Sequence, residues 1–287
     1  MPSIDNAALE RLINDVLASS KYKDIHPDLI RNVATLELQK RRSFKDALKA
    51  TKNKLHQVGG AYFAGHGELE STTNFSGWLA ELQRAAQVED QARKVSTRIM
   101  SNHASTKERI PILEQFYSSL FADLQPIHSI LDLACGLNPL ALPWMELADD
   151  VEYYAYDIYE HMMDFLNQYL QLMSVQGHAQ ALDVLQACPT REVDVALLLK
   201  ALPCLEQVDK QAAHALLSKL NARCIIVSYP VHSLGGRSKG MVTHYETQFR
   251  ELIQGQANHS GREWAIKRYS FETELVFTLK KEIAPSG

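Results

Sequence analysis

Ile130-Leu131-Asp132-Leu133-Ala134-Cys135-Gly136 is a short apolar segment with the composition of a buried β-strand, and it stops at a glycine where the chain can turn. From here on, short apolar runs alternate with segments that have helical spacing. Further strands are expected at residues 151–156, 179–182, 193–199 and 224–227, with helices at 162–173 and 207–220. Strands that alternate with helices indicate a mostly parallel sheet with crossover helices.

The two ends of the chain complete this plan. Residues 264–280 alternate between polar and apolar side chains in the manner of an antiparallel hairpin. The first hundred residues have helical periodicity instead, with Pro27 at a helix start and with Ser43 and Asp46 in the positions of a capping box. We therefore expect an α/β protein: a helical N-terminal domain followed by a Rossmann-like domain with a seven-stranded sheet.

The composition is that of a globular protein, since 46% of the 287 residues are hydrophobic and 22% are charged. No apolar run approaches 18 residues, and acidic residues near the N-terminus argue against a secretory signal. The cysteines form no CxxC pair and no metal-ligand cluster: Cys135, Cys188, Cys204 and Cys224. We expect a monomeric, cytoplasmic protein with reduced thiols, no membrane partner and no bound metal.

Positive charge is concentrated near the N-terminus. The segment from Lys21 to Lys54 holds ten Lys and Arg residues against four Asp and Glu, although the whole chain has a net charge of -4. A basic segment on an acidic body suggests that this segment meets a polyanion such as nucleic acid. Solvated helix faces would account for the same charges, and the sequence leaves both readings open.

Acidic residues accompany three successive strands. Asp132 lies in the first strand, Asp157 ends the second, and Asp183 ends the third. Ligands of open α/β sheets bind at the carboxyl ends of the strands. Asp157 follows Asp132 at about the spacing at which an acid meets the ribose of a bound nucleotide, and Asp183 can reach an adenine amino group. The alternative is that these acids form turns and cap helices.

The turn after the first strand restricts the class of cofactor. It contains Gly136 but no GxGxxG pattern, which argues against a dinucleotide whose pyrophosphate needs a glycine-rich turn. S-adenosylmethionine has no phosphate and carries a sulfonium cation, so it suits a site with fewer glycines and more acids. The sequence therefore predicts a class I methyltransferase fold, with a mostly parallel sheet and a C-terminal antiparallel hairpin, that binds S-adenosylmethionine.

Four longer segments resemble one known family. They are Leu55-His56 with Gly60-Ala61-Tyr62, His103-Ala104-Ser105-Thr106-Lys107-Glu108-Arg109, Leu137-Asn138-Pro139 directly after the Cys-Gly turn, and Ser233-Leu234-Gly235-Gly236-Arg237-Ser238-Lys239-Gly240-Met241. In this order they resemble the aminoglycoside-resistance 16S rRNA (guanine(1405)-N7)-methyltransferases of the Arm and Rmt type. The resemblance spans both halves of the chain, and it is weakest in residues 63–77 and 254–262.

The resemblance implies roles for individual residues around the cofactor. Arg109 would meet the carboxylate of the methionine part, Asp157 would hold the ribose, and Asp183 with Val184 would flank the adenine. The full cofactor-binding set that we predict is His103, Ser105, Arg109, Asp132, Ala134, Gly136, Asp157, Ile158, Asp183, Val184, Lys200, Ala201 and Leu202. The product would be S-adenosylhomocysteine.

The resemblance also implies a division of labour along the chain. Residues 1–105 would form a basic domain that docks on 16S rRNA in the assembled 30S subunit, and residues 106–287 would form the methyltransferase domain. We expect the docking residues to be separate from the cofactor site. The predicted RNA-binding residues are Lys21, Lys23, Arg31, Lys52, Lys54 and Arg237, and those that position the target base are Lys200, Arg237 and Met241.

Guanine N7 has a lone pair and no proton, so its methylation needs positioning and no acid–base residue. The N7 edge faces the narrow major groove of A-form RNA, so the base should be extruded toward the cofactor. Two other functions remain open from the sequence. One is a methyltransferase of the same fold that acts on another RNA or a small molecule. The other is a non-catalytic RNA-binding or ribosome-assembly protein.

Overall fold

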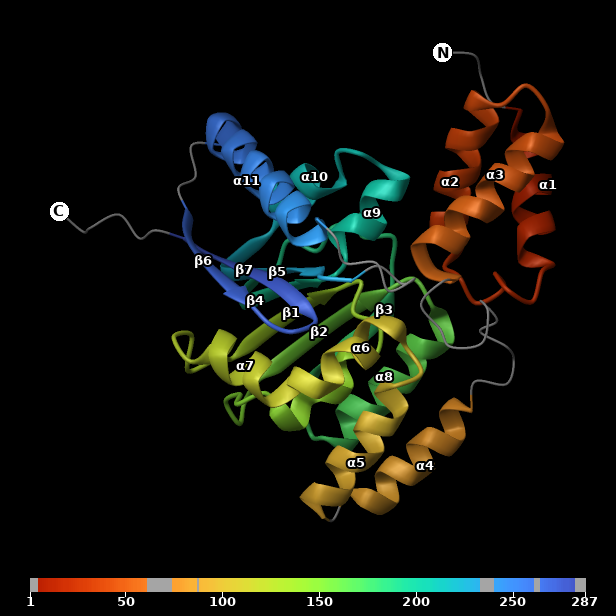
Figure 1. Ribbon diagram of the computed structural model, residues 1–287. Helices are drawn as coiled ribbons and strands as arrows, with labels where there is room; N and C mark the ends of the chain where they lie inside the picture. The colour runs from red at the N-terminus through yellow and green to blue at the C-terminus, as the bar shows by residue number, and fades with distance from the viewer. Residues whose placement is uncertain (1–4, 61–73, 87, 233–239, 261–263, 282–287) are drawn as a thin grey trace.

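The computed structural model describes residues 5–60, 74–86, 88–232, 240–260 and 264–281. Its centre is a seven-stranded sheet in the order β3-β2-β1-β4-β5-β7-β6 (Figure 1). The strands are β1 (Ser129–Leu133), β2 (Glu152–Asp157), β3 (Gln176–Ala181), β4 (Glu192–Leu199), β5 (Asn221–Pro230), β6 (Trp264–Ser270) and β7 (Glu274–Lys281). Strands β1 to β5 pair in parallel, while β7 pairs antiparallel with both β5 and β6. This confirms the predicted class I methyltransferase fold.

Helices cover both faces of the sheet. They are α6 (Ala104–Arg109), η2 (Ile110–Ile112), α7 (Leu113–Phe121), η3 (Asn138–Trp144), α8 (Glu160–Leu172), α9 (Leu202–Val208), α10 (Ala212–Lys219) and α11 (Met241–Ser260). The single helix predicted at 207–220 was wrong. The Asp209 side chain accepts a hydrogen bond from the backbone N–H of Gln211 at 2.9 Å, and this turn separates α9 from α10.

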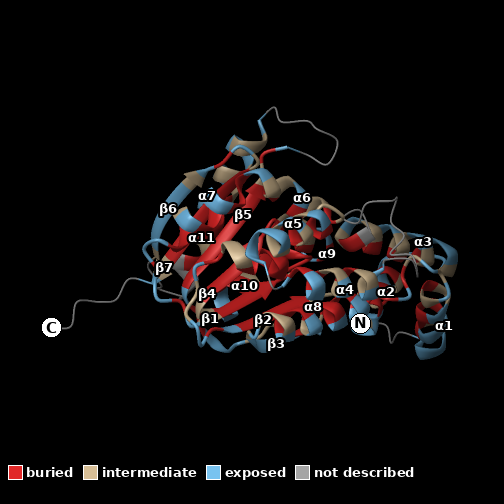
Figure 2. Cartoon of the chain, turned by 90° about the horizontal axis from the view of Figure 1, so that it is seen from below, coloured by how far each residue is buried: buried red, intermediate tan, exposed pale blue. Residues whose placement is uncertain are grey.

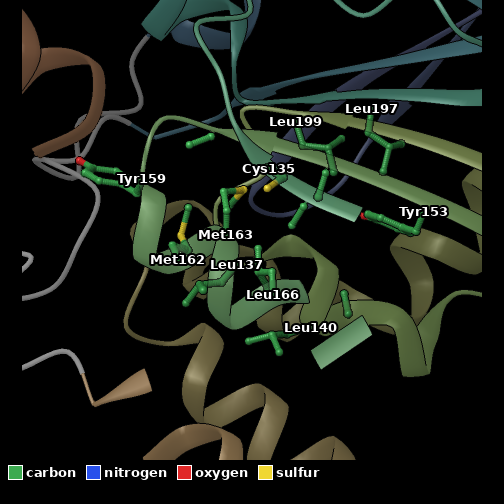
Figure 3. Packing of buried hydrophobic residues seen from close by; sticks show 14 of the residues in the cluster. Cys135, Leu137, Leu140, Tyr153, Tyr159, Met162, Met163, Leu166, Leu197 and Leu199 are labelled. Carbon is green, nitrogen blue, oxygen red and sulfur yellow. The ribbon is translucent and has the colours of Figure 1, made fainter. Parts of the chain in front are cut away.

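Two buried apolar clusters lie on the two faces of the sheet. Figure 2 shows the buried strands between helices whose outer faces are exposed. On one face, Leu197 and Leu199 of β4 belong to the same cluster as Met162 and Leu166 of α8, part of which Figure 3 shows. Side chains alternate in orientation along a strand, so β4 contributes one set of residues to each cluster, which is why residues 195–199 of this strand are all apolar.

The N-terminal helices occupy two different places. Helices α1 (Asn6–Leu17), α2 (Pro27–Lys40) and α3 (Phe44–Leu55) form a bundle beside the carboxyl edge of the sheet, and the π-helical turn η1 (His56–Gly60) follows α3 (Figure 1). Helices α4 (Phe75–Ala85) and α5 (Glu89–Met100) pack on α8 and η3 instead. The Ser43 hydroxyl caps α3 by accepting from the Asp46 N–H at 3.2 Å, as the sequence indicated.

Candidate functional site

A pocket opens at the carboxyl ends of β1 to β4. The pocket is lined by Leu29, Val58, Gly59, His103, Ser105, Ala134, Asp157, Ile158, Tyr159, Leu182, Asp183, Val184, Leu185, Leu199, Lys200, Ala201, Cys204, Leu205 and Val208. It lies where β1 and β4 are neighbours although their crossover connections run in opposite directions, the position at which open α/β sheets bind ligands.

Asp157 is fixed at the end of β2 by the turn after β1. Its carboxylate accepts from the N–H of Gly136 at 2.8 Å and from the N–H of Ile158 at 2.7 Å. Burial raises the pKa of Asp157, and these two backbone hydrogen bonds oppose that rise. Gly136 has a φ of 53° and leaves no room for a Cβ, which would lie 2.6 Å from the His103 ring. The glycine therefore lets the turn pass under His103 and reach Asp157.

Asp183 follows the end of β3, lines the pocket there and is almost fully buried. One carboxylate oxygen accepts from the N–H of Leu185 at 3.1 Å, and the other accepts from the Asn32 side-chain amide of α2 at 3.2 Å. Burial raises the pKa of Asp183, while both hydrogen bonds lower it. The pocket thus has two carboxylates with fixed orientations, at the ends of adjacent strands.

Asp132 does not line the pocket, although we predicted that it binds the cofactor. It is fully buried beneath the turn, where its carboxylate accepts from Asn138 Nδ2 at 2.9 Å and from the Tyr153 hydroxyl at 2.7 Å. Asn138 belongs to the Leu-Asn-Pro motif, and its side-chain oxygen accepts from Arg109 at 2.8 Å. Asp132 therefore acts in this structure by orienting Asn138, which in turn orients Arg109.

Arg109 is also fully buried, and its carboxylate partner in this structure is Glu274 of β7. Nη2 donates to Glu274 Oε2 at 3.0 Å, and Nε lies 2.8 Å from Oε1 in the same ion pair. Burial raises the pKa of Glu274, but Arg109 and Lys200 lower it by more, so that it lies below its ordinary value. The predicted contact of Arg109 with a cofactor carboxylate stays a prediction, and it would require sharing this guanidinium with Glu274.

Among the described residues that line the pocket, Lys200 is the one that carries an ammonium group. Its φ of 58° turns the chain sharply after β4, and its N–H donates to the Ser228 hydroxyl at 3.1 Å. The ammonium donates to Glu108 at 2.7 Å and lies 3.4 Å from Glu274. Two cations, Arg109 and Lys200, therefore face two carboxylates beside the pocket.

Most of the predicted cofactor residues meet at this pocket. Those that line it are His103, Ser105, Ala134, Asp157, Ile158, Asp183, Val184, Lys200 and Ala201. The other four predicted residues do not line it: Arg109, Asp132, Gly136 and Leu202. Sequence reasoning missed the α2 and η1 wall, formed by Leu29, Val58 and Gly59, and the apolar α9 wall, formed by Cys204, Leu205 and Val208.

The α2 and η1 wall belongs to residues 1–105, although none of the described residues predicted to dock on RNA lines the pocket. The N-terminal bundle itself contributes to the pocket, and the Lys54 ammonium donates to the Gln207 carbonyl of α9. Arg31 forms an ion pair with Glu10 at 2.6 Å, whereas Lys23 is exposed. Met241 begins α11 and is partly exposed, and it does not line the pocket. Arg237 lies outside the described residues.

Residues 18–278 match the family of the ribosomal RNA methyltransferase FmrO. The chain belongs to this family. It is similar to a 16S rRNA (guanine(1405)-N(7))-methyltransferase of Micromonospora rosea, with 35% identity over 95% of this chain and 97% of the relative. A relative with the same description from Serratia marcescens is 32% identical over 94% of this chain and 97% of its own length.

Solved structures of the same family agree with the fold. The 16S rRNA methyltransferase RmtF in complex with S-adenosyl-L-homocysteine has a TM-score of 0.80 and 30% identity, covering 98% of this chain and all of that one. The 16S rRNA methylase RmtB has a TM-score of 0.76 and 28% identity, covering 96% of this chain and 98% of that one. S-adenosylmethionine is accordingly the cofactor of this family member. No helix in the described ranges is long and apolar enough to cross a membrane.

The buried charges make a testable contribution to the stability of this methyltransferase. We predict that Glu274→Gln lowers the free energy of unfolding by about 3–5 kcal/mol, because it leaves Arg109 buried without its carboxylate. Urea unfolding measures this loss. The control is Glu246→Gln, which removes ion pairs with the surface residues Arg250 and Arg268 and should cost below about 1 kcal/mol. Equal losses in the two variants would contradict the prediction.

His103 gives the stability a pH dependence. Burial, followed by the charges of Lys200 and Arg109, lowers its pKa to about 3. An unfolded histidine has a pKa of about 6.5, so below that pH the unfolded chain binds a proton that the folded chain does not. The free energy of unfolding should therefore fall through this group by about 1.4 kcal/mol per pH unit as the pH drops from 6 to 4.

In His103→Gln this contribution should disappear, so that urea unfolding at several pH values gives a shallower slope than in the wild type. His128→Gln serves as the control, because His128 is half-exposed beside the surface residue Asp150. The same slope in wild type and His103→Gln would show that the buried histidine is protonated in the folded protein.

Proposed function

We propose that the chain transfers a methyl group from S-adenosylmethionine to N7 of guanine 1405 of 16S rRNA in the assembled 30S subunit, and so confers aminoglycoside resistance. Family membership over nearly the whole chain supports this, as do relatives of the same length that carry this description. The observation on the structure that carries the proposal is the pocket at the carboxyl ends of β1 to β4, with Asp157 and Asp183 fixed at its rim.

The pocket's residues fit this cofactor. Asp157, held by two backbone N–H groups, has the position to accept from ribose hydroxyls, and Asp183 has the position to accept from the adenine amino group. The apolar side chains between and opposite them suit the faces of the adenine ring. Lys200 lines the pocket and suits the methionine carboxylate, and Arg109 is a second cation that shares Glu274 with it.

When bound, S-adenosylmethionine supplies an electrophilic methyl group, which guanine N7 can accept without giving up a proton. The chain's own residues therefore need to exclude water and to hold the reacting atoms in line. The buried cations are neutralised by Glu108 and Glu274, which keeps Lys200 in place at the mouth of β4. In our proposal Lys200, Arg237 and Met241 position the extruded base, and the basic residues of α1 to α3 contact phosphates.

Methylation at N7 converts the guanine into a cation that no longer accepts a hydrogen bond at this atom. A polycationic aminoglycoside loses an acceptor there and meets a positive charge instead. This accounts physically for resistance. We propose that the protein acts as a monomer in the cytoplasm, where it meets the 30S subunit.

The role of Asp157 is tested by calorimetry with S-adenosylhomocysteine. Asp157→Ala should weaken binding by about 1.5–3 kcal/mol, because the ribose loses its charged acceptor. Asp150→Ala changes an exposed acid near the amino end of β2 and should bind as the wild type does. Wild-type affinity in a folded Asp157→Ala protein would remove this residue from the site.

The substrate is tested by transfer of a tritiated methyl group to 30S subunits, naked 16S rRNA and whole ribosomes in parallel, with strand scission at 7-methylguanine to locate the product. We expect one modified guanine in 30S subunits and poor activity on naked rRNA. Phosphate contacts carry little sequence information, so selection needs the native shape of the decoding region. Equal methylation of naked rRNA and subunits would refute the proposed substrate form, and activity on neither would favour another substrate.

A further inference from the structure

The amino end of α2 is joined to the rim of the pocket. The His26 N–H donates to the Ile158 carbonyl at 2.7 Å, and the Glu160 N–H donates to the Asp24 carbonyl at 3.0 Å. Ile158 follows Asp157 directly, so the segment that begins α2 is hydrogen-bonded to the chain beside one of the two pocket carboxylates. One turn further, Leu29 contributes its side chain to the pocket wall.

The same helix also reaches the second pocket carboxylate. Asn32 lies about one turn after Leu29, on the same face of α2, and its amide donates to Asp183 at 3.2 Å. Asn32 and Asp183 are 151 residues apart in the sequence. Helix α2 therefore runs from the chain beside Asp157 to Asp183 and contacts both sides of the predicted adenosine site.

Packing around η1 strengthens this connection. Gly59 lines the pocket, and a Cβ there would lie 2.3 Å from the Tyr159 hydroxyl and 2.8 Å from Ile158 Cδ1. Figure 3 places Tyr159 at the end of the core cluster that lies toward these N-terminal segments. The end of α3 is tied to α9 as well, through Lys54 and the carbonyl of Gln207. A ligand in the pocket thus contacts the bundle and the sheet at once.

The bundle that forms this wall is also the basic part of the chain. Its solvent side carries Lys23, Lys40, Arg42, Lys45 and Lys49, among others. Anything that fixes the bundle against the sheet also fixes these charges in space. Two ligands that both favour one arrangement of the same element raise each other's affinity by the same factor.

We propose that Asn32 is a positioning residue that couples the two binding events: through its bond to Asp183, cofactor in the pocket holds the α1–α3 bundle in the arrangement that binds the 30S subunit. This inference rests on the proposed function for the identity of the two ligands. By reciprocity, the docked subunit raises the affinity for cofactor. Asn32 itself orients an acceptor of the adenine and takes no part in the methyl transfer.

The test measures binding of the full chain to 30S subunits with and without saturating S-adenosylhomocysteine, which binds without turnover. For the wild type we expect the cofactor to raise subunit affinity about fivefold or more. In Asn32→Leu, which keeps the volume and removes the donor, this factor should fall to about one, and calorimetry should show weaker binding of S-adenosylhomocysteine. Subunit affinity without cofactor should stay near that of the wild type.

Asn53→Leu is the matched control, because Asn53 is exposed on α3 and does not line the pocket. This variant should keep the wild-type coupling factor. A factor of one in the wild type, or the same factor in wild type and Asn32→Leu, would overturn the inference while leaving the proposed activity intact. A wild type that binds S-adenosylhomocysteine but no subunit would instead contradict the proposed substrate, and the coupling with it.

Discussion

The buried ion pair between Arg109 and Glu274 is the interaction on which the site depends. It joins α6 to β7, the strand between β5 and β6, and through Asn138 it reaches the turn after β1. Burying these charges is costly, and the cost is offset by the partners that Asn138, Ser228 and Lys200 supply. Glu274 also accepts from the Ser228 hydroxyl, which receives the N–H of Lys200 in turn. A single buried polar network around Arg109 and Glu274 therefore positions the turns that carry Gly136 and Lys200.

Much of the fold and of the pocket could be predicted because the sequence patterns that indicate them are local. The strands appear as short apolar runs, and Asp157 and Asp183 stand where such runs end, so both the fold and the two pocket carboxylates follow from sequence neighbours. The roles of Arg109 and Asp132 were harder to predict, because their partners are distant in the sequence. Nothing near Arg109 announces that Glu274, 165 residues away, takes its guanidinium. Asp132 was assigned to the cofactor by its strand, whereas Tyr153 and Asn138 hold it in the core.

The N-terminal wall of the pocket illustrates the same limit. The helical spacing of α2 predicts that Leu29 and Ile30 are buried, but it does not predict what they are buried against. That depends on the bridge between Ile25 and Tyr159, a contact across more than a hundred residues. Dividing the chain by its sequence pattern into a helical part and an α/β part separates α2 and η1 from the strand ends with which they share one cavity. The sequence pattern shows where the type of secondary structure changes, whereas long-range packing decides which residues meet.

This shared cavity bears on how a phosphate-binding surface can act on one particular base. Contacts to phosphates set register and orientation but do not read sequence. The basic bundle is hydrogen-bonded to the pocket rim at Ile158 and at Asp183, so a bundle that bound cofactor holds in this arrangement has a set distance between its charges and the pocket. A surface with that fixed spacing can select a base by its position on a folded RNA, without contacting base edges along the way. The hydrogen bonds from the α2 segment to Ile158 and Asp183 therefore contribute to the choice of substrate as well as to stability.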